Sequence, residues 1–344
     1  MNILLTCAGR RGYEVDAFRT AINGRGLVVA CDADPTAPSM ALADRAVVVP
    51  RVDELGYVDA LIAVCAREAI DLLVPVLETE LPLLAARRTE FEAVGTIVLV
   101  SSSEVISTCH DKLASAAALA GWGIRSPRTY TSLAAAADAV RNGELAFPVL
   151  VKPRFGVGSI GIQRADDPAD LAMAERACRK QASSRLLTPP PGIDPACLVL
   201  FQECLLGQEY GIDIVNDLDG RYVTTLVRRK LRIRAGQTDR AMTITDPRLE
   251  RLGERIGHGL GHRGILDCDL FVDGDDLCVI DLNPRFGGGY PFSHAAGANL
   301  PAAFVAWTAG ELADPAWLRV GAEVTVARYD DFVVAGRAGH EGKG

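Results

Sequence analysis

The chain has 344 residues, which is long enough for two or three subdomains with ample hydrophobic core. Its apolar fraction of 49% and charged fraction of 23% are typical of a soluble globular protein. The net charge of −8 argues against nucleic acid as the main partner, although small anions can still bind local lysines and arginines.

The nine cysteines contain no C-x-x-C pair, so neither a zinc site nor a disulfide framework is predicted. Several lie in expected strands, where a reduced cysteine is a small apolar side chain, and this fits a reducing cytoplasm. The amino terminus lacks a signal-peptide pattern, and no stretch reaches the roughly 18 apolar residues of a membrane span. We therefore expect a cytoplasmic protein that has neither a membrane nor a nucleic acid as partner.

Residues 1 to about 100 alternate strand and helix signals, which predicts a parallel, doubly wound α/β sheet. The turn after the first strand partly resembles a dinucleotide-binding turn, and Asp32 closes the second strand. Cys7 and Arg10 stand where that turn requires glycines, so an NAD-dependent oxidoreductase is disfavoured. Strands are expected at 2–7, 27–31, 46–49, 71–76 and 96–100, helices at 12–22, 57–67 and 81–86, and a turn-rich loop at 34–40.

Four charged side chains follow strands of this sheet: Arg10 and Arg11 after the first, and Glu78 and Glu80 after a later one. Open α/β sheets bind ligands at the carboxyl ends of their strands, so all four are candidate substrate contacts. Two simpler roles stay open. The arginines can cap a turn or pair with surface acids, and the glutamates can be ordinary acids in a first helical turn.

A capped helix is expected to start at 101–104 and to continue through Lys112 to Ala120. Further on, the strand 147–153 carries Lys152 near its end and runs into a glycine-rich turn. That turn is not a P-loop, because no G-K-[ST] follows. Its backbone N–H groups can still lie over phosphates beside Lys152, although a flexible hairpin is the alternative. The candidate turn residues are Gly156, Gly158, Ser159 and Gly161.

The next segments are a helix at 166–182, a mobile proline-rich loop at 186–195 and a strand at 198–202 that leads into Glu203, Cys204 and Leu205. Strands 209–215 and 222–228 are expected to form a hairpin. The basic stretch 228–240, which includes Arg240, is expected to be a solvated loop or a cover over a triphosphate. Later elements are helices at 248–257 and 301–309 and a short strand near 324–327.

An acidic hairpin is predicted at 267–289, because a polar cluster at 273–276 divides two apolar runs. A three-residue loop centred near Asp275 places Asp269 directly opposite Asp281, with Asn283 on the same face as Asp281. Two facing carboxylates repel each other unless a divalent cation lies between them. Hard oxygen ligands of this kind suit Mg²⁺ that is held partly by substrate phosphates.

Arg285 follows this hairpin and can donate two hydrogen bonds to a phosphate. The glycines at 287–289, including Gly288 and Gly289, allow the backbone to come close to a ligand. The alternative is a simple acidic hairpin with a glycine-rich exit.

The order of these motifs resembles the ATP-grasp superfamily, in particular its carbamoyl-phosphate-synthase-like branch, which includes biotin carboxylase relatives and the pyrrolysine-pathway lysine–ornithine ligase. The resemblance implies an α/β fold that becomes α+β in the ATP-grasp part. It implies a Rossmann-like pre-ATP-grasp domain at 1–108, a two-lobed ATP-grasp domain at 109–335 with a mobile lid at about 125–202, and a tail at 336–344.

The resemblance also implies roles for individual residues. Lys112, Lys152 and the glycine-rich turn would contact ATP phosphates, residues 203–205 would form the hinge that binds adenine, and Glu209 would bind the ribose hydroxyls. Without the family pattern, an ordinary helix-surface lysine at 112 and a cross-strand partner of a cation at Glu209 are favoured. Asp269, Asp281 and Asn283 correspond to Mg²⁺ ligands, with Mn²⁺ as a substitute. Arg285, Lys152 and Asn283 would be the catalytic residues. The family usually has Glu at the position of Asp281 and Gln or Glu at that of Asp269, so the number of cations is open.

The function that the resemblance implies is an ATP-dependent carboxylate–amine ligase. Such an enzyme forms an amide or peptide bond through an acyl phosphate and releases ADP and phosphate. Its substrates would be small, amino-acid-like carboxylates and amines, and a homodimer is compatible with the sequence. The alternatives are a one-half carbamoyl-phosphate-synthase-like enzyme that phosphorylates bicarbonate or carbamate, and an ATP-binding regulatory protein without turnover.

Overall fold

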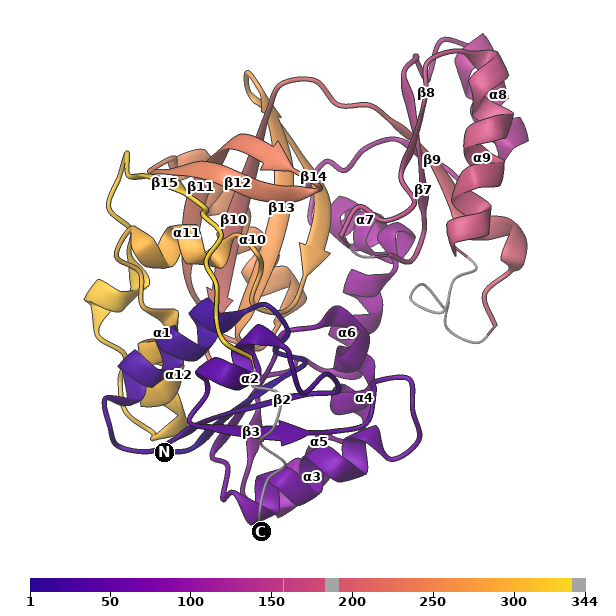
Figure 1. The fold of residues 1–344 in the computed structure, drawn as a ribbon. Helices are drawn as coiled ribbons and strands as arrows, with labels where there is room; N and C mark the ends of the chain where they lie inside the picture. The colour runs from indigo at the N-terminus through magenta and orange to yellow at the C-terminus, as the bar shows by residue number, and fades with distance from the viewer. Residues whose placement is uncertain (157, 183–191, 336–344) are drawn as a thin grey trace.

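The computed structural model describes residues 1–156, 158–182 and 192–335 (Figure 1). The start of the expected loop at 186–195 and the tail at 336–344 lie outside these residues. No described helix is long and apolar enough to cross a membrane. The strands form three sheets, one parallel and two antiparallel, and this confirms the expected α/β and α+β combination.

The amino-terminal sheet is parallel, with strand order β3-β2-β1-β4-β5, as the alternating strand and helix pattern predicted. Its strands are β1 (Ile3–Thr6), β2 (Val28–Asp32), β3 (Arg45–Val48), β4 (Leu72–Pro75) and β5 (Ile97–Val98). Its helices are α1 (Gly12–Ile22), α2 (Pro38–Leu42), α3 (Tyr57–Arg67), α4 (Leu81–Ala86) and α5 (Arg88–Ala93), with a 3-10 turn η1 (Glu78–Glu80) after β4.

Alternate residues of each central strand enter different cores. Ile3 and Leu5 pack with α1 on one face of the sheet, whereas Leu4 packs with α3 on the other. Phe286, from the far end of the chain, packs in the first core, with its ring centroid 5.8 Å from that of Phe18. The amino-terminal sheet therefore shares a core with the segment that follows the acidic hairpin.

The central sheet is antiparallel, with strand order β14-β13-β10-β11-β12-β15. Its strands are β10 (Gln208–Asn216), β11 (Tyr222–Arg234), β12 (Gln237–Ile244), β13 (Ile265–Asp273), β14 (Asp276–Asn283) and β15 (Thr325–Ala327). The expectation of a loop at 228–240 is wrong, because β11 and β12 pair across this stretch and leave only a turn at Ala235 and Gly236. The alternation of apolar and basic residues there is that of a long hairpin with one polar face.

Three helices accompany the central sheet: α10 (Pro247–Leu260), α11 (Tyr290–Ala295) and α12 (Leu300–Thr308). A short 3-10 turn η4 (Pro315–Leu318) follows α12. α10 packs on β10 and β11, and α12 packs against α1 of the amino-terminal part (Figure 1). α11 was not expected from the sequence, where the glycine-rich run had been interpreted as an exit loop.

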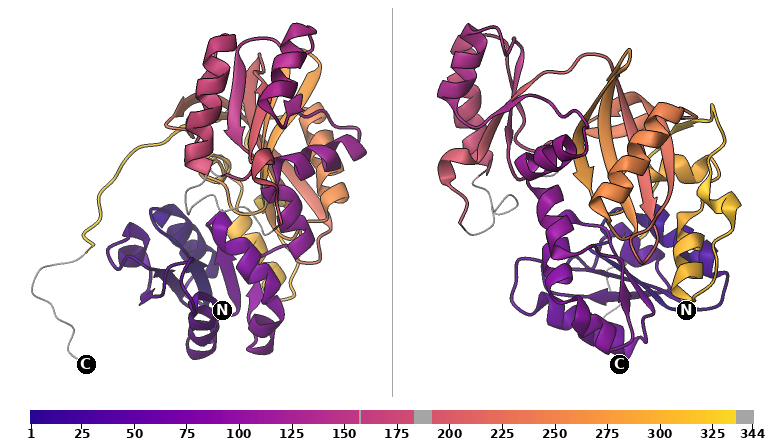
Figure 2. Two further views of the ribbon diagram at one scale, coloured as in Figure 1. Left: turned by 90° about the vertical axis from the view of Figure 1, so that its right-hand side faces the viewer. Right: turned by 180° about the vertical axis from the view of Figure 1, so that it is seen from behind.

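The third sheet, with strand order β6-β9-β7-β8, stands off from the rest as a separate arm (Figure 2). It contains β6 (Thr129–Tyr130), β7 (Val149–Pro153), β8 (Gln163–Ala165) and β9 (Val199–Glu203), with α8 (Leu133–Arg141) and α9 (Pro168–Ala182) and the 3-10 turn η3 (Pro195–Cys197). Two helices, α6 (Ser103–His110) and α7 (Lys112–Gly121), lead into it. The single helix expected from 101 to 120 is thus broken at Asp111, which caps α7 by accepting a hydrogen bond from the N–H of Leu113.

Candidate active site

The facing acids of β13 and β14 have the predicted register: Asp269 is paired directly with Asp281. The physical basis differs from the expected one. The hairpin loop has two residues, Gly274 and Asp275, instead of the expected three, which by itself would pair Asp269 with Ile280. A bulge at Ile280 shifts the register by one residue, so that Asp269 is paired with Asp281 after all. The amide nitrogen of Asn283 lies 3.3 Å from a carboxylate oxygen of Asp281, so these two side chains share one face of β14.

Asp269 is held by a lysine that the sequence analysis did not single out. The ammonium of Lys230, on β11, lies 2.6 Å from Asp269 and 2.7 Å from Glu209. Burial raises the pKa of Asp269 to about 6, and nearby Asp267 adds to this effect while Lys230 opposes it. Glu209, expected to bind a ribose, is thus paired with a cation in this structure. The predicted strand ends at Arg228, whereas β11 continues to Arg234 and so carries Lys230 to these acids.

These oxygens fit a metal that arrives with a nucleotide better than a permanent metal centre. No three His, Cys, Asp or Glu side chains of the described ranges converge as a ready metal cluster. Asp281 forms no ion pair with any described residue, so its carboxylate is available, and Asn283 and Asp269 add further oxygens. Mg²⁺ at nucleotide sites is commonly held by one or two carboxylates together with substrate phosphates.

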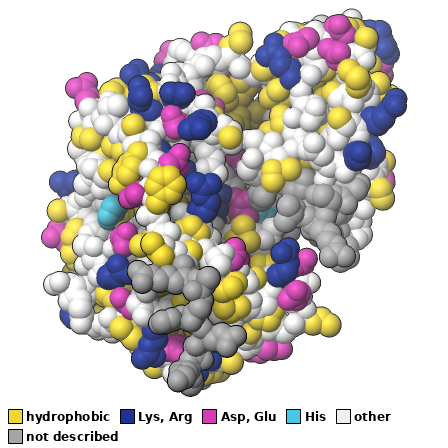
Figure 3. Space-filling view, viewed as in Figure 1, with side chains coloured by type: hydrophobic (Ala, Val, Ile, Leu, Met, Phe, Trp, Pro, Cys, Tyr) yellow, Lys and Arg dark blue, Asp and Glu magenta, His cyan; other side chains and the backbone are white. Residues whose placement is uncertain are grey.

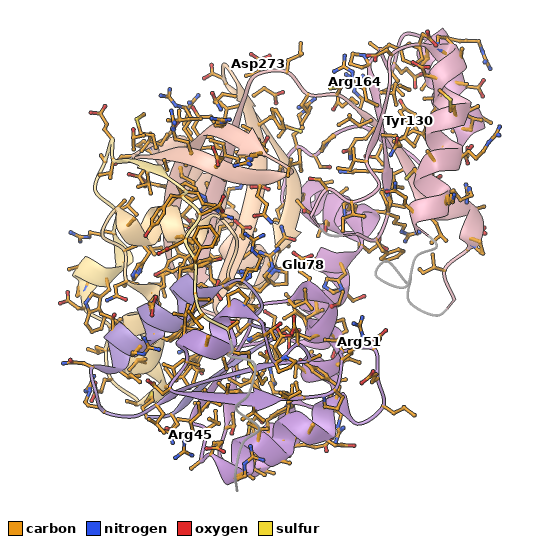
Figure 4. All side chains as sticks on the ribbon, in the orientation of Figure 1. Arg45, Arg51, Glu78, Tyr130, Arg164 and Asp273 are labelled. Atoms are coloured by element: carbon orange, nitrogen blue, oxygen red, sulfur yellow. The ribbon has the colours of Figure 1, made fainter. Side chains whose placement is uncertain are left out.

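A chain of buried charges runs from the central sheet to the amino-terminal part. Arg228, whose side chain is 1% exposed, lies 2.6 Å from both Asp213 and Asp267. Asp267 lies 3.4 Å from Arg285, and Arg285 forms a close ion pair with Glu78. Figure 4 labels Glu78 at the junction of the two parts. Burial alone would raise the pKa of Asp267, but the surrounding cations bring it below its ordinary value.

Two of the glycines after the hairpin pack directly against these buried charged side chains, and there is no room for a side chain at either position. A Cβ on Gly289 would lie 2.1 Å from a guanidinium nitrogen of Arg228, and one on Gly287 would lie 2.1 Å from the carboxyl carbon of Asp267. Gly288 is less constrained, because the nearest atom to a Cβ added there would be a guanidinium nitrogen of Arg328, 3.8 Å away. The backbone at these glycines does come close to another group, as the sequence predicted, but that group is the buried ion pair of Arg228 and Asp267 and not a ligand.

Two lysines lie on the other side of Asp281. Lys152 is 7% exposed and has no ion pair with a described residue. Burial lowers its pKa to about 8, the nearby charge of Lys112 lowers it further, and Asp281 opposes both effects. The ammonium of Lys112 donates a hydrogen bond of 3.0 Å to the carbonyl of Gly156 in the glycine-rich turn. A buried cation without a counterion is costly, and an anion bound at these two lysines would offset that cost.

The glycine-rich turn lies against the tip of the β11–β12 hairpin. A Cβ on Gly236 would lie 3.1 Å from the hydroxyl of Ser159 and 3.4 Å from the carbonyl of Gly158. Gly158, Ser159 and Gly161 all have positive φ, of 60°, 61° and 84°, so the turn depends on residues that tolerate this conformation. Val157, between Gly156 and Gly158, lies outside the described residues.

A cavity of about 200 Å³ lies beside the expected hinge. The carboxylate of Glu203 accepts hydrogen bonds of 2.8 Å from the guanidinium of Arg125 and from the backbone N–H of Arg128. Arg125 also lies 2.8 Å from Asp276. The side chain of Glu203 is therefore occupied by these contacts, which stabilise the backbone beside the cavity. The cavity is lined by Arg125, Glu203, Cys204, Leu205, Leu206, Phe271, Asp273, Asp276 and Cys278.

Of the four charged candidates that follow strands of the amino-terminal sheet, Glu78 is the one whose side chain is paired with Arg285. Arg11 is used internally, since it pairs with Glu14 at 3.0 Å and donates to the carbonyl of Phe286 at 2.9 Å. Arg10 has an 87% exposed side chain, and its ion pair with Asp330 spans 3.9 Å. This position is compatible with the alternative that Arg10 pairs with a surface acid and does not contact a substrate.

One of the proposed contacts, Glu80, is wrong, and a second, Arg240, points away from Lys230. Glu80 is 0% exposed, and its carboxylate accepts hydrogen bonds from the hydroxyl of Tyr57 and from the N–H groups of Val76 and Leu77. It stabilises the turn after β4 and offers no surface to a substrate. Arg240 follows the alternation of β12: its neighbour Ala241 is paired with Lys230, so the side chain of Arg240 points to the opposite face from Lys230.

The surface is hollowed between the arm and the body of the molecule, and basic and acidic side chains meet at the floor of this hollow (Figure 3). The hinge cavity, the two lysines and the acid pair are built mainly from α7, from β7 and β9 of the arm, and from β13 and β14 of the central sheet. The sequence identified the motifs on these elements. It did not identify the residues that tie them together, Arg125, Arg228, Lys230 and Asp267.

Comparisons with known proteins agree with this architecture. A family model for the PylC-like N-terminal domain matches residues 3–99. A second, described as ATP-grasp in the biosynthetic pathway with Ter operon, matches residues 196–331.

Among curated proteins, the formate-dependent phosphoribosylglycinamide formyltransferase of Synechococcus sp. (strain RCC307) is 26% identical over 291 residues, which are 83% of this chain and 69% of that protein. The carbamoyl phosphate synthase large chain of Kineococcus radiotolerans is 25% identical over 231 residues, 64% of this chain, but the chain spans only 20% of its length.

Among solved structures, a biotin carboxylase from Campylobacter jejuni in complex with β,γ-ATP superposes with a TM-score of 0.70 at 16% identity. The match covers 93% of this chain and 73% of that one. At this identity the likeness shows the fold.

Proposed function

Since the chain is an enzyme of the ATP-grasp superfamily, we propose that it joins a small carboxylate to an amine at the expense of ATP. In this reaction the carboxylate takes the γ-phosphate of ATP, ADP leaves, and the amine displaces phosphate from the resulting acyl phosphate. The observation that carries the proposal is the buried, unpaired Lys152 beside Lys112 and opposite Asp281. This arrangement has a place for an anion and for the cation that accompanies it.

The nucleotide would occupy the hinge cavity, with its base against residues 203–205 and its phosphates directed towards Lys112 and Lys152. Asp281, Asn283 and Asp269 would hold Mg²⁺, which reduces the negative charge of the phosphates when it is bound. Lys230 must then share Asp269 and Glu209 with the nucleotide and its metal, because it occupies both carboxylates in this structure.

Arg285 would bind the phosphoryl group during transfer. Its guanidinium is fixed from two sides by Glu78 and Asp267, so it needs little reorganisation when negative charge develops beside it. The glycine-rich turn would cover the phosphates and exclude water, which protects the acyl phosphate from hydrolysis. Neither Arg285 nor Lys152 forms a covalent intermediate in this scheme.

The test is carboxylate-dependent release of ADP, measured over a panel of amino acids and small carboxylates in the presence of Mg²⁺. Asp281→Asn should lower the rate by at least about 100-fold, because it removes charge from the proposed metal site. Asp275→Asn, at the fully exposed tip of the same hairpin, is the matched control and should leave the rate unchanged. An Asp281→Asn enzyme that turns over at the wild-type rate contradicts the proposed site.

A further inference from the structure

His110 lies within the electrostatic influence of Glu78, Asp281 and Arg285 but has no role in the scheme above. It is the last residue of α6, and the chain turns sharply after it, because Asp111 caps α7 and accepts a hydrogen bond of 2.7 Å from Arg154. Lys112 then reaches towards the glycine-rich turn.

The imidazole of His110 has no hydrogen-bond partner among the described residues. Its Nε2 is buried and unsatisfied, and no bond of Nδ1 to a described residue is found either. Buried polar groups are nearly always hydrogen-bonded, and leaving one unpaired costs roughly 1 to 3 kcal/mol. A side chain kept in this condition within a site requires an explanation beyond packing.

Four charged groups from three parts of the fold act electrostatically on the ring. Glu78 of η1 and Arg285 come from the junction with the amino-terminal part, Lys112 comes from α7, and Asp281 comes from β14. Two positive and two negative groups leave little net charge at the ring. Burial is the largest influence and lowers the pKa of His110 below its ordinary value. The imidazole is therefore neutral at neutral pH and able to accept a proton.

The other acids near Arg285 are already engaged. Glu78 is paired with Arg285 itself, and Asp267 is paired with both Arg228 and Arg285. Asp281 belongs to the proposed metal site. An amine that reaches an acyl phosphate beside Arg285 therefore finds in His110 a neutral base whose lone pair is not in use.

We propose that His110 accepts a proton from the substrate ammonium, so that the amine attacks the acyl phosphate as a neutral nucleophile. This inference rests on the proposed ligase reaction. The ammonium transfers one proton to the imidazole, and its nitrogen lone pair then forms the C–N bond. The bond between the acyl carbon and the phosphate oxygen breaks, and the phosphate leaves with the second proton of the nitrogen. The imidazolium returns its proton to solvent after product release.

Hydroxylamine separates this step from the formation of the acyl phosphate, because it is unprotonated at neutral pH and traps acyl phosphates as hydroxamates without a base. His110→Gln and wild type are compared with the carboxylate that gives most ADP release, first with hydroxylamine and then with the amines of the panel. His258→Gln is the control, because His258 is exposed on α10. Circular dichroism and ATP binding verify that each variant is folded.

His110→Gln is expected to form hydroxamate within twofold of wild type and to form amide about 100-fold more slowly, the scale of general base catalysis. The deficit should shrink as pH rises, since more of the amine is then unprotonated in solution. Amide formation at the wild-type rate overturns the inference. An equal loss of hydroxamate and amide also overturns it, because His110 would then act before the amine step. A wild-type enzyme that forms hydroxamate but no amide overturns it as well, whereas one that forms neither contradicts the proposed function itself.

Discussion

Arg285, which follows β14, forms an ion pair with Glu78, which lies 207 positions earlier in the chain after β4. The same guanidinium lies 3.4 Å from Asp267 of β13. Arg285 is thus fixed at the contact between the amino-terminal parallel sheet and the central antiparallel sheet. In our account this contact places the arginine beside the phosphoryl group and gives the amino-terminal part a direct role in the chemistry.

Glu78→Gln should therefore impair the enzyme in a specific way. Arg285 loses one of its two counterions, so the Michaelis constant for the carboxylate should rise about tenfold while the dissociation constant for ATP changes little. Loss of a buried charged partner should also lower the free energy of unfolding by roughly 1 to 3 kcal/mol. Steady-state kinetics and urea unfolding measure both effects. Glu90→Gln, which alters an exposed ion pair, is the control, and equal behaviour of the two variants would refute the role of Glu78.

Lys152→Met should stabilise the protein without nucleotide and abolish ATP binding. Its pKa of about 8 lies below the value of 10.5 for an ordinary lysine, so the folded state bears the cost of the buried charge in full below pH 8. As pH rises from about 8 towards 10.5 the unfolded chain binds more protons, and wild-type stability should rise relative to that of Lys152→Met. Thermal unfolding at pH 7 and pH 9.5 tests this difference, and a variant less stable than wild type at pH 7 contradicts it.

The same lysine predicts how ATP affinity depends on pH. In the proposed site ATP binds the protonated ammonium, so the dissociation constant should increase as pH passes about 8, where the free protein loses this proton. Lys152→Arg should show a much flatter profile, because a guanidinium stays protonated throughout this range. Calorimetric titrations between pH 7 and pH 9.5 distinguish the two proteins. Parallel profiles would show that another group controls the affinity.

Gly289→Ala and Gly288→Ala form a matched pair that tests the role of the glycine-rich run. The new methyl group at 289 would lie 2.1 Å from a guanidinium nitrogen of the buried Arg228, whereas at 288 the nearest atom, on Arg328, is 3.8 Å away. Gly289→Ala should lower the free energy of unfolding by about 1 to 3 kcal/mol, the usual cost of overpacking. Gly288→Ala should be close to neutral. Urea unfolding gives both values, and similar values for the two variants would mean that packing against Arg228 does not require this glycine.

The acid pair shows how much the sequence can predict. Alternation along each strand and the polar cluster at 273–276 were enough to place Asp269 opposite Asp281. The loop proved one residue shorter, and the bulge at Ile280 restored the register. Nothing local in the sequence marks that bulge, because it arises from how β14 pairs with β13. The correct result therefore depended on two compensating features of the hairpin.

The ion pairs between residues far apart in the chain could not be predicted from the sequence. Arg228 and Lys230 belong to a basic run that resembles a solvated loop, and only their pairing with acids on β10 and β13 shows that they are buried. Glu80 presents the opposite case. Its place after a strand indicated a ligand contact, but the backbone N–H groups beside it and the hydroxyl of Tyr57 occupy its carboxylate. Local patterns identify which residues carry charge, and the tertiary structure decides which of those charges stay available.

The transfer of oxygen from the carboxylate to phosphate tests the central claim most directly. The carboxylate that gives most ADP release is supplied with both oxygens labelled as ¹⁸O, together with ATP, Mg²⁺ and an amine, and the released phosphate is analysed by mass spectrometry. Attack of the carboxylate on the γ-phosphate followed by C–O cleavage predicts one labelled oxygen in each phosphate molecule formed with the amide. Amide formation with unlabelled phosphate would contradict an acyl phosphate intermediate and the roles given to Lys152, Asp281 and Arg285.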